Sequence, residues 1–333
     1  MTPLVSIVLP ARNAATTLRA CLASIARQML TTWECIIVDD GSTDATASVA
    51  RDATRGDVRF RIVSMPARGL ISALNRGLED AGAPLIARMD ADDVMHRERL
   101  AAQVEALELD ATLSAVGCHV RMWPRGSMSG GLREYERWLN GLRSAEDVAR
   151  DAFVECPVAH PTLLMRREMA DLGYGDCAWP EDYDLILRAI GRGLRIGVVP
   201  RRLLLWRDRP DRLSRRDPRY SAARFTACRA HHLAAGFLAG RDEYILWGYG
   251  GTGRSLRRSL AALGKRPAHI IDIKPGRLGQ RIHGAPVVPP AALRDLERRP
   301  IVVSVAFDGP RAQIRQELAS MGFVELRDYV CAA

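Results

Sequence analysis

The sequence has no long hydrophobic run. None of its apolar stretches reaches the length of about 18 residues that a membrane-spanning helix needs. Residues 1–6 lead directly into a strand pattern, without a basic segment followed by a signal-peptide core. We therefore expect a globular protein of the cytoplasm.

The seven cysteines include no Cys-x-x-Cys pair. This scatter argues against a zinc site and against a disulfide framework, and it is typical of a protein kept in a reducing compartment. We expect the cysteines to be small buried hydrophobic residues. They are Cys21, Cys35, Cys118, Cys156, Cys177, Cys228 and Cys331.

The positive charge is unevenly distributed. The chain carries a net charge of +9, and residues 192–230 alone contain 12 Arg and 3 Asp. Such a segment suits anionic phosphates or an anionic membrane surface, and a solvated face explains it equally well. Because no zinc finger, helix-turn-helix or aromatic RNA-binding signature accompanies it, we expect no nucleic-acid partner. Peripheral contact with the inner face of the membrane stays open.

Strand and helix patterns alternate in the first part of the chain. Buried strands are predicted at residues 5–10, 35–38, 60–63 and 85–89, and helices at 15–28, 45–55 and 69–80. This alternation predicts an α/β fold with a mostly parallel sheet, in which ligands bind at the carboxyl ends of the strands. Two acidic pairs, Asp39 with Asp40 and Asp90 with Asp92, fall at such ends.

The strand at 85–89 delivers three aspartates within four positions, Asp90, Asp92 and Asp93. Such carboxylates repel one another unless a cation lies among them. Hard oxygen ligands on a tight turn suit Mg²⁺ or Mn²⁺. A solvated acidic turn is the alternative for any isolated Asp-x-Asp.

Six runs in order carry a family resemblance. They are residues 5–13, 36–44, 69–75, 87–93, 160–162 and 181–185. Together these runs resemble a family 2 glycosyltransferase of the GT-A fold, over about the first two thirds of the chain. The resemblance implies a nucleotide-diphospho-sugar donor, first of all a UDP-sugar, with Mn²⁺ or Mg²⁺ as cofactor and inversion at the anomeric carbon. The acceptor would be a glycan, a lipid-linked oligosaccharide or a protein, in surface polysaccharide or glycoconjugate synthesis.

The resemblance also implies roles for particular residues. Asp92 would ligate the metal, Asp90 would hold the ribose, and Arg88 would lie against the nucleotide. Asp39 or Asp40 would accept hydrogen bonds from the base and ribose. The rest of the donor-binding set comprises Pro10, Arg12, Asn13, Asn75, Ala91 and Glu181.

Asp182 is the implied general base that deprotonates the acceptor hydroxyl. A positioned carboxylate contributes on the order of 10²–10⁴-fold in such a step. Asp182 directly precedes a predicted helix at 183–191, and a plain helix cap is the alternative role. His160 either approaches the acceptor or fixes a turn before Pro161.

The resemblance fails at one position. Where relatives carry a histidine near the metal or diphosphate, this chain has Arg209, which cannot ligate a metal. Arg207 and Arg209 are candidate diphosphate contacts, because the guanidinium group pairs with phosphate. Aromatic residues between 119 and 155 would either form an acceptor pocket or pack against the sheet.

A second domain is predicted at 242–333, after a transferase domain at 1–217 and a helical connector at 218–241. Its strand, its glycines Gly248, Gly250 and Gly253, its helix and its terminal Asp272 resemble a dinucleotide-binding fingerprint. The domain is either a second nucleotide site or a Rossmann-like accessory module without a cofactor. Two further functions stay open: a nucleotide-sugar oxidoreductase that uses this loop, and a non-catalytic glycan-binding protein.

Overall fold

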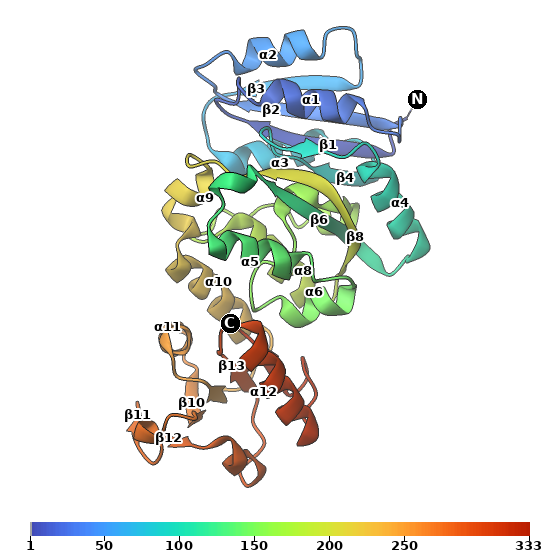
Figure 1. Ribbon diagram of the computed structural model, residues 1–333. Helices are drawn as coiled ribbons and strands as arrows, with labels where there is room; N and C mark the ends of the chain where they lie inside the picture. Colours follow the sequence, from blue (N-terminus) through green and yellow to red (C-terminus); the bar gives the residue numbers. More distant parts are fainter. Residues whose placement is uncertain (1) are drawn as a thin grey trace. The chain divides into compact units, whose positions relative to one another are not determined.

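The computed structural model describes residues 2–333, which form two units, each built around its own sheet (Figure 1). The first unit comprises Met1–Ala149, Pro157–Cys177 and Asp184–Arg215. The second comprises Arg150–Cys156, Ala178–Tyr183 and Arg216–Ala333. Among the described residues, no helix combines the length and the apolar character required to cross a membrane.

The sheet of the first unit has the strand order β3-β2-β1-β4-β7-β6-β8-β5. β1, β2, β3 and β4 run parallel, as do β6 and β8, whereas β7 and β5 run antiparallel to their neighbours. The strands are β1 Val5–Ala11, β2 Trp33–Asp40, β3 Phe60–Met65, β4 Leu85–Arg88, β5 Val94–Met95, β6 Leu113–Trp123, β7 Leu164–Arg166 and β8 Arg195–Arg207. The mostly parallel sheet agrees with the fold predicted from the alternating pattern.

Helices cover this sheet. Three of the boundaries between the two units fall inside helices, in α6, α8 and α9. The α-helices are α1 Leu18–Ala26, α2 Thr46–Ala53, α3 Leu70–Asp80, α4 Arg99–Leu109, α5 Gly130–Leu139, α6 Ala145–Asp151, α7 Arg167–Ala170, α8 Glu181–Gly191 and α9 Leu213–Arg216, and the 3₁₀ turns are η1 Arg125–Ser127 and η2 His160–Thr162. α1 begins later than the predicted residue 15. The backbone N–H groups of Ala14 and Ala15 donate to the side chains of Thr46 and Asp44 instead, which holds this segment as a turn.

The centre of the first unit is apolar and closely packed. Every residue of β1 is buried, as the continuous hydrophobic run predicted. α3 lies so close to β1 that a Cβ atom on Gly77 would be 2.4 Å from Val8 Cγ1. The seven cysteines form no disulfide among the described residues, and six of them are buried, as expected.

The sheet of the second unit has the order β11-β12-β10-β9-β13-β14, in which only β11 runs antiparallel. Its elements are η3 Pro218–Tyr220, α10 Ala222–Ala235, β9 Glu243–Trp247, α11 Gly251–Ala261, β10 Arg266–Ile271, η4 Pro275–Arg277, β11 Arg281–Ile282, β12 Ala285–Val288, η5 Pro290–Arg294, β13 Ile301–Val303, α12 Asp308–Ser320 and β14 Tyr329–Cys331. The predicted helical connector is thus a 3₁₀ turn followed by α10. A core of its own, with Tyr244, Leu256 and Val302 fully buried, holds the unit together.

Candidate functional site

The two acidic pairs of the first unit meet at one edge of the sheet. β1 lies between β2 and β4, with Ala11 opposite Asp39 and Val8 opposite Arg88. Since the three strands are parallel, the segments that follow β2 and β4 leave the sheet on the same side. The structure therefore brings Asp39 and Asp40 to the edge that also carries the turn after Arg88.

Asp40 is buried and holds the start of α3. Its carboxylate accepts hydrogen bonds from the backbone N–H groups of Arg68 at 2.7 Å and Gly69 at 3.0 Å. The half-exposed Arg12 lies 3.5 Å from the same carboxylate. Asp39, also buried, accepts a hydrogen bond from the N–H of Ser42 at 3.1 Å. Both aspartates thus shape the loops around the edge.

Asn13 ties the loop after β1 to the loop after β2. Its backbone is in the left-handed region, with φ of 50°, and its side-chain oxygen accepts a hydrogen bond from the N–H of Thr43 at 2.8 Å. Its own N–H donates to Ser42 Oγ at 3.0 Å. Pro10 is buried within β1, opposite Val38. These contacts join the loops that follow β1 and β2 at this edge.

The acidic turn rests on a buried polar platform. Arg88 is buried and forms an ion pair with Asp90. Beneath it, the fully buried Arg99 donates to the carbonyl of Arg88 at 3.0 Å and to Gln103 Oε1 at 2.9 Å. Gln103 in turn donates to the carbonyl of Thr162 at 2.7 Å. This pair was not predicted from the sequence, where its one signal is the helical spacing of four residues between Arg99 and Gln103.

The three aspartates of the turn converge. One carboxylate oxygen from each of Asp90, Asp92 and Asp93 lies within 4.8 Å of the other two. Burial raises the pKa of Asp92, and the Asp90 carboxylate raises it further, whereas Arg212 and Arg209 lower it. Burial raises the pKa of Asp93 well above its usual value, and the carboxylates of Asp90 and Asp92 add to this shift. The turn therefore concentrates negative charge in a poorly solvated place.

These residues fit a divalent cation. They supply several hard oxygen donors on one tight turn, the donor set that Mg²⁺ and Mn²⁺ prefer. Oδ2 of the buried Asp93 has no hydrogen-bond partner in the described part of the chain. An ionised oxygen in that position is costly unless a cation lies beside it. The sequence prediction assigned the metal to Asp92, and the structure adds Asp93 to the candidate ligands.

The end of β8 is joined to the acidic turn. The N–H of Arg207 donates to Asp93 Oδ1 at 2.7 Å, and its Nε donates to the carbonyl of Asp92 at 2.7 Å. The Arg207 guanidinium also lies 4.5 Å from the ring centre of Trp123. Arg207 therefore supports the turn itself.

Arg209 and Arg212 follow on the same loop and are electrostatic neighbours of Asp92. Arg209 pairs with Asp211, and Arg212 lies 4.7 Å from the ring centre of Trp206. Of these two, only Arg209 was predicted from the sequence as a diphosphate contact. The pair gives the acidic turn a cationic counterpart.

Asn75 and His160 have structural contacts. Both amide atoms of Asn75 bond to the backbone of Tyr174, at 2.8 and 2.9 Å. His160 Nε2 lies 2.7 Å from the Tyr174 hydroxyl. Burial lowers the pKa of His160 well below its usual value, and Arg88 adds to this shift. These contacts favour the turn-fixing alternative for His160.

The aromatic residues of the 119–155 region divide into two groups. Tyr135 stacks on Trp138 with ring centres 5.8 Å apart, and both pack against the core of the first unit. Trp123 is 46% exposed. Ordinary packing accounts for the first group, and Trp123 presents an aromatic surface to solvent.

Glu181 and Asp182 belong to the second unit, at the start of α8. The buried Glu181 accepts a hydrogen bond from the Tyr220 hydroxyl at 2.7 Å. Burial raises the pKa of Tyr220, and Glu181 and Asp182 raise it further. Asp182 Oδ1 accepts a hydrogen bond from the N–H of Tyr183 at 2.7 Å. The roles of Glu181 and Asp182 in donor binding and catalysis stay predictions.

The glycine-rich loop of the second unit combines a left-handed glycine with a close backbone approach. Gly248 has φ of +94°, and a Cβ atom on Gly253 would lie 2.2 Å from the Gly248 carbonyl oxygen. Gly250 precedes α11 and has open space around it. The buried Asp272 at the end of β10 accepts hydrogen bonds from Arg277 Nη1 at 2.6 Å and from the N–H of Lys274 at 3.0 Å. Nucleotide binding at this loop stays a prediction.

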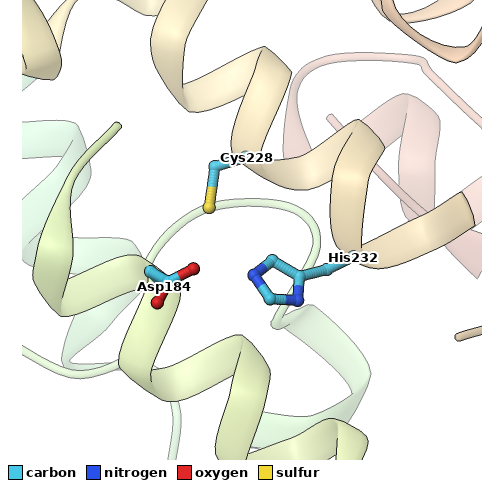
Figure 2. A group of neighbouring side chains, drawn as sticks. All are labelled: Asp184, Cys228 and His232. Carbon is cyan, nitrogen blue, oxygen red and sulfur yellow. The ribbon is translucent and has the colours of Figure 1, made fainter. Parts of the chain in front are cut away.

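Figure 2 shows three side chains of metal-ligating types, Asp184 on α8 and Cys228 and His232 on α10. Asp184 belongs to the first unit, and the other two belong to the second. The Asp184 carboxylate accepts a hydrogen bond from Arg188 Nε at 2.6 Å. We assign no site to this group.

Comparison with known sequences identifies relatives of this chain. The model of the family described as "Glycosyl transferase family 2" matches residues 6–172. The chain is 29% identical over 231 residues to the "Uncharacterized glycosyltransferase EpsJ" of Bacillus subtilis, which covers 64% of each protein. It is 32% identical over 210 residues to the "Succinoglycan biosynthesis protein ExoU" of Rhizobium meliloti, which covers 59% of each. The chain thus spans less than two thirds of the length of these relatives.

Solved structures share the fold. The TarS 1-349 structure from S. aureus, in complex with UDP-GlcNAc, is 17% identical, with a TM-score of 0.53 over 79% of this chain and 71% of that one. The mannosyltransferase PcManGT of Pyrobaculum calidifontis, in complex with GDP-Man and Mn²⁺, is 22% identical, with a TM-score of 0.53 over 79% and 70%. These likenesses confirm the predicted GT-A type of α/β fold.

Proposed function

Because the chain belongs to glycosyl transferase family 2, we propose that it is a metal-dependent, inverting hexosyltransferase that uses a nucleotide-diphospho-sugar. The observation that carries the proposal is the acidic turn after β4. Asp90, Asp92 and Asp93 converge there, and Asp93 Oδ2 lacks a hydrogen-bond partner among the described residues. A solvated acidic turn would leave no such oxygen buried.

The donor would bind along the edge that carries β1, β2 and β4. Asp92 and Asp93 would hold a divalent cation, and Asp90 would be available to the ribose. When bound, the cation neutralises the negative charge that develops on the departing nucleoside diphosphate. Arg209 and Arg212 would pair with the phosphate oxygens through their guanidinium groups. Asp39 and Arg12 would border the base.

The acceptor hydroxyl needs a base, because a neutral hydroxyl is a weak nucleophile. We assign this role to Asp182. In an inverting reaction the base removes the hydroxyl proton while the oxygen attacks the anomeric carbon on the face opposite the leaving diphosphate. The proton then rests on the Asp182 carboxylate, and the diphosphate leaves with the bonding electron pair.

The relatives support the class of donor and the biological setting. The neighbouring structures contain UDP-GlcNAc in one protein and GDP-Man with Mn²⁺ in another. One relative is named for succinoglycan biosynthesis. We therefore propose a UDP-sugar as the first donor to test and a polysaccharide or glycoconjugate as the product.

The decisive experiment measures binding and turnover of UDP-, GDP- and dTDP-sugars with and without Mn²⁺. For Asp92→Ala we expect loss of metal-dependent donor binding, because a cation ligand is removed. For Asp182→Asn we expect donor binding to persist while turnover falls on the order of 10²–10⁴-fold.

Asp52→Asn is the matched control, because Asp52 is an exposed carboxylate that pairs with Arg55 on the surface. It should leave both readouts unchanged. If no nucleotide sugar binds and NAD(H) binds instead, the glycine-rich loop is the working site and the transferase proposal is wrong. Donor binding that never leads to turnover with any acceptor would favour a glycan-binding protein.

A further inference from the structure

A hollow of about 540 Å³ opens on the surface of the first unit, where α1 ends and where β5 pairs with β8. Four arginines line it: Arg27, Arg97, Arg121 and Arg202. They come from four separate parts of the chain. No role in the proposed transfer reaction involves them.

The hollow carries positive charge without a matching negative charge. None of its lining residues is Asp or Glu. In the described part of the chain, Arg27, Arg121 and Arg202 form no ion pair, and Arg97 approaches only Glu98, at 3.8 Å. Some other arginines of the basic 192–230 segment are paired: Arg195 with Glu146, Arg209 with Asp211, Arg215 with Asp208 and Arg219 with Asp217. The hollow therefore brings together positive charge from four separate parts of the chain, most of it unpaired among the described residues.

Apart from Ser24 and His96, the rest of the lining is apolar. Val94 and Met95 of β5 pair with Leu205 and Leu204 of β8. Leu205 is 44% exposed and so offers an apolar side chain to solvent. An inorganic anion would be satisfied by the arginines alone, so the apolar wall calls for a ligand with a hydrocarbon part.

The same sheet face continues the pattern beyond the hollow. Arg121 is opposite Leu205, and Trp123 follows two residues later on β6, so their side chains share one face. Trp123 is 46% exposed, and Arg207 lies across its ring. Exposed tryptophan and leucine beside arginine is the composition of surfaces that lie in the membrane interface.

We propose that this face of the first unit docks on an anionic membrane, with a lipid phosphate held by Arg27, Arg121 and Arg202 and acyl chain against Val94 and Leu205. Charge complementarity selects the headgroup, and the apolar wall selects a lipid over a soluble phosphate. The proposal assigns a membrane-binding role to part of the chain's excess positive charge. It is independent of the transferase assignment.

The first test is sedimentation of the full chain with vesicles of phosphatidylcholine, alone or mixed with phosphatidylglycerol. We expect binding to the anionic vesicles only, weakened as salt rises, because exposed charges are screened. Inorganic pyrophosphate at millimolar concentration should not release the protein. Failure to bind anionic vesicles, or full release by pyrophosphate, would overturn the proposal.

Two matched triple variants locate the surface. Arg27→Ala/Arg121→Ala/Arg202→Ala should lower vesicle partitioning roughly 100-fold, since each basic residue near an anionic surface contributes about one kcal/mol. Arg51→Ala/Arg137→Ala/Arg192→Ala removes the same charge from exposed positions outside the hollow. This variant should lower vesicle partitioning far less. Equal loss in both variants would mean that binding follows net charge alone, and the proposal would be wrong.

A separate variant tests the apolar wall. Leu205→Ser should weaken vesicle binding and leave circular dichroism and donor hydrolysis unchanged, because Leu205 is exposed and lies outside the acidic turn. Unchanged vesicle binding by this variant would contradict the insertion of an acyl chain.

Discussion

At the residue scale, Asp93 shows how a side chain acquires its role from its surroundings. In the sequence it is the last of three neighbouring aspartates. In the structure one of its oxygens accepts the Arg207 N–H and the other has no hydrogen-bond partner among the described residues. The first contact fixes the turn to β8, and the second oxygen is available to a cation. The sequence pattern alone does not show that Asp93, and not Asp90 or Asp92, has these two roles.

His160 provides a pH prediction at the same scale. Burial lowers the pKa of the His160 imidazole in the folded protein. In the unfolded chain this imidazole takes up a proton near pH 6.5, whereas in the folded protein it does not. Stability therefore falls as pH decreases below about 6.5, by up to about 1.4 kcal/mol per pH unit. The free energy of unfolding, measured by thermal unfolding between pH 5 and 7.5, should depend less steeply on pH in His160→Gln than in the wild type.

The control for this experiment is Met29→Gln, because Met29 is 59% exposed and neither side chain titrates. It should keep the slope of the wild type. If His160→Gln retains the full slope as well, another group is responsible for it and the buried neutral histidine is not the cause.

At the element scale, patterns predicted which segments form strands and helices, and contacts decided where they begin. The strand at 85–89 was predicted from a short apolar run and is observed as β4. The predicted helix at 45–55 is shorter in the structure, at Thr46–Ala53. The side chain of Asp44 bonds to the N–H of Thr46, which places the turn before it.

The glycine-rich loop gives a prediction about an element. Gly253→Ala would place a methyl group 2.2 Å from the Gly248 oxygen and 2.6 Å from Ser304 Oγ. We expect it to destabilise the second unit by about 1–3 kcal/mol, the usual range for overpacking. Gly251→Ala, in the same helix with nothing within 4 Å, should stabilise by about 0.4–1 kcal/mol. Urea unfolding of both variants measures their stability. If Gly253→Ala were as stable as Gly251→Ala, the close packing around Gly253 would be refuted.

At the scale of the whole molecule, each unit has its own sheet and its own core. The proposed donor site lies on the first unit, whereas the glycine-rich loop and Asp272 lie on the second. A nucleotide sugar should therefore protect the edge of the first sheet and leave the glycine-rich loop unchanged.

Hydrogen exchange measures this directly. A nucleotide sugar with Mn²⁺, at 100 times its Kd, stabilises the state that binds it by about 2.7 kcal/mol. We expect slower exchange at residues 39–44 and 88–94 and no change at 248–253. Protection of 248–253 by NAD(H), or by the nucleotide sugar itself, would assign a ligand to the second unit.

The α/β fold, the family and the edge at which the acidic pairs meet were all predicted from the sequence. These follow from local features, because apolar runs specify strands and parallel strands end on the same side of a sheet. The platform of Arg99 and Gln103 and the arginine-lined hollow were decided by tertiary structure. Arg121 and Arg202 are 81 positions apart in the chain, and only the pairing of β6 with β8 brings their strands together. Local patterns do not encode such pairs, because side chains from distant segments acquire their neighbours when the sheet forms.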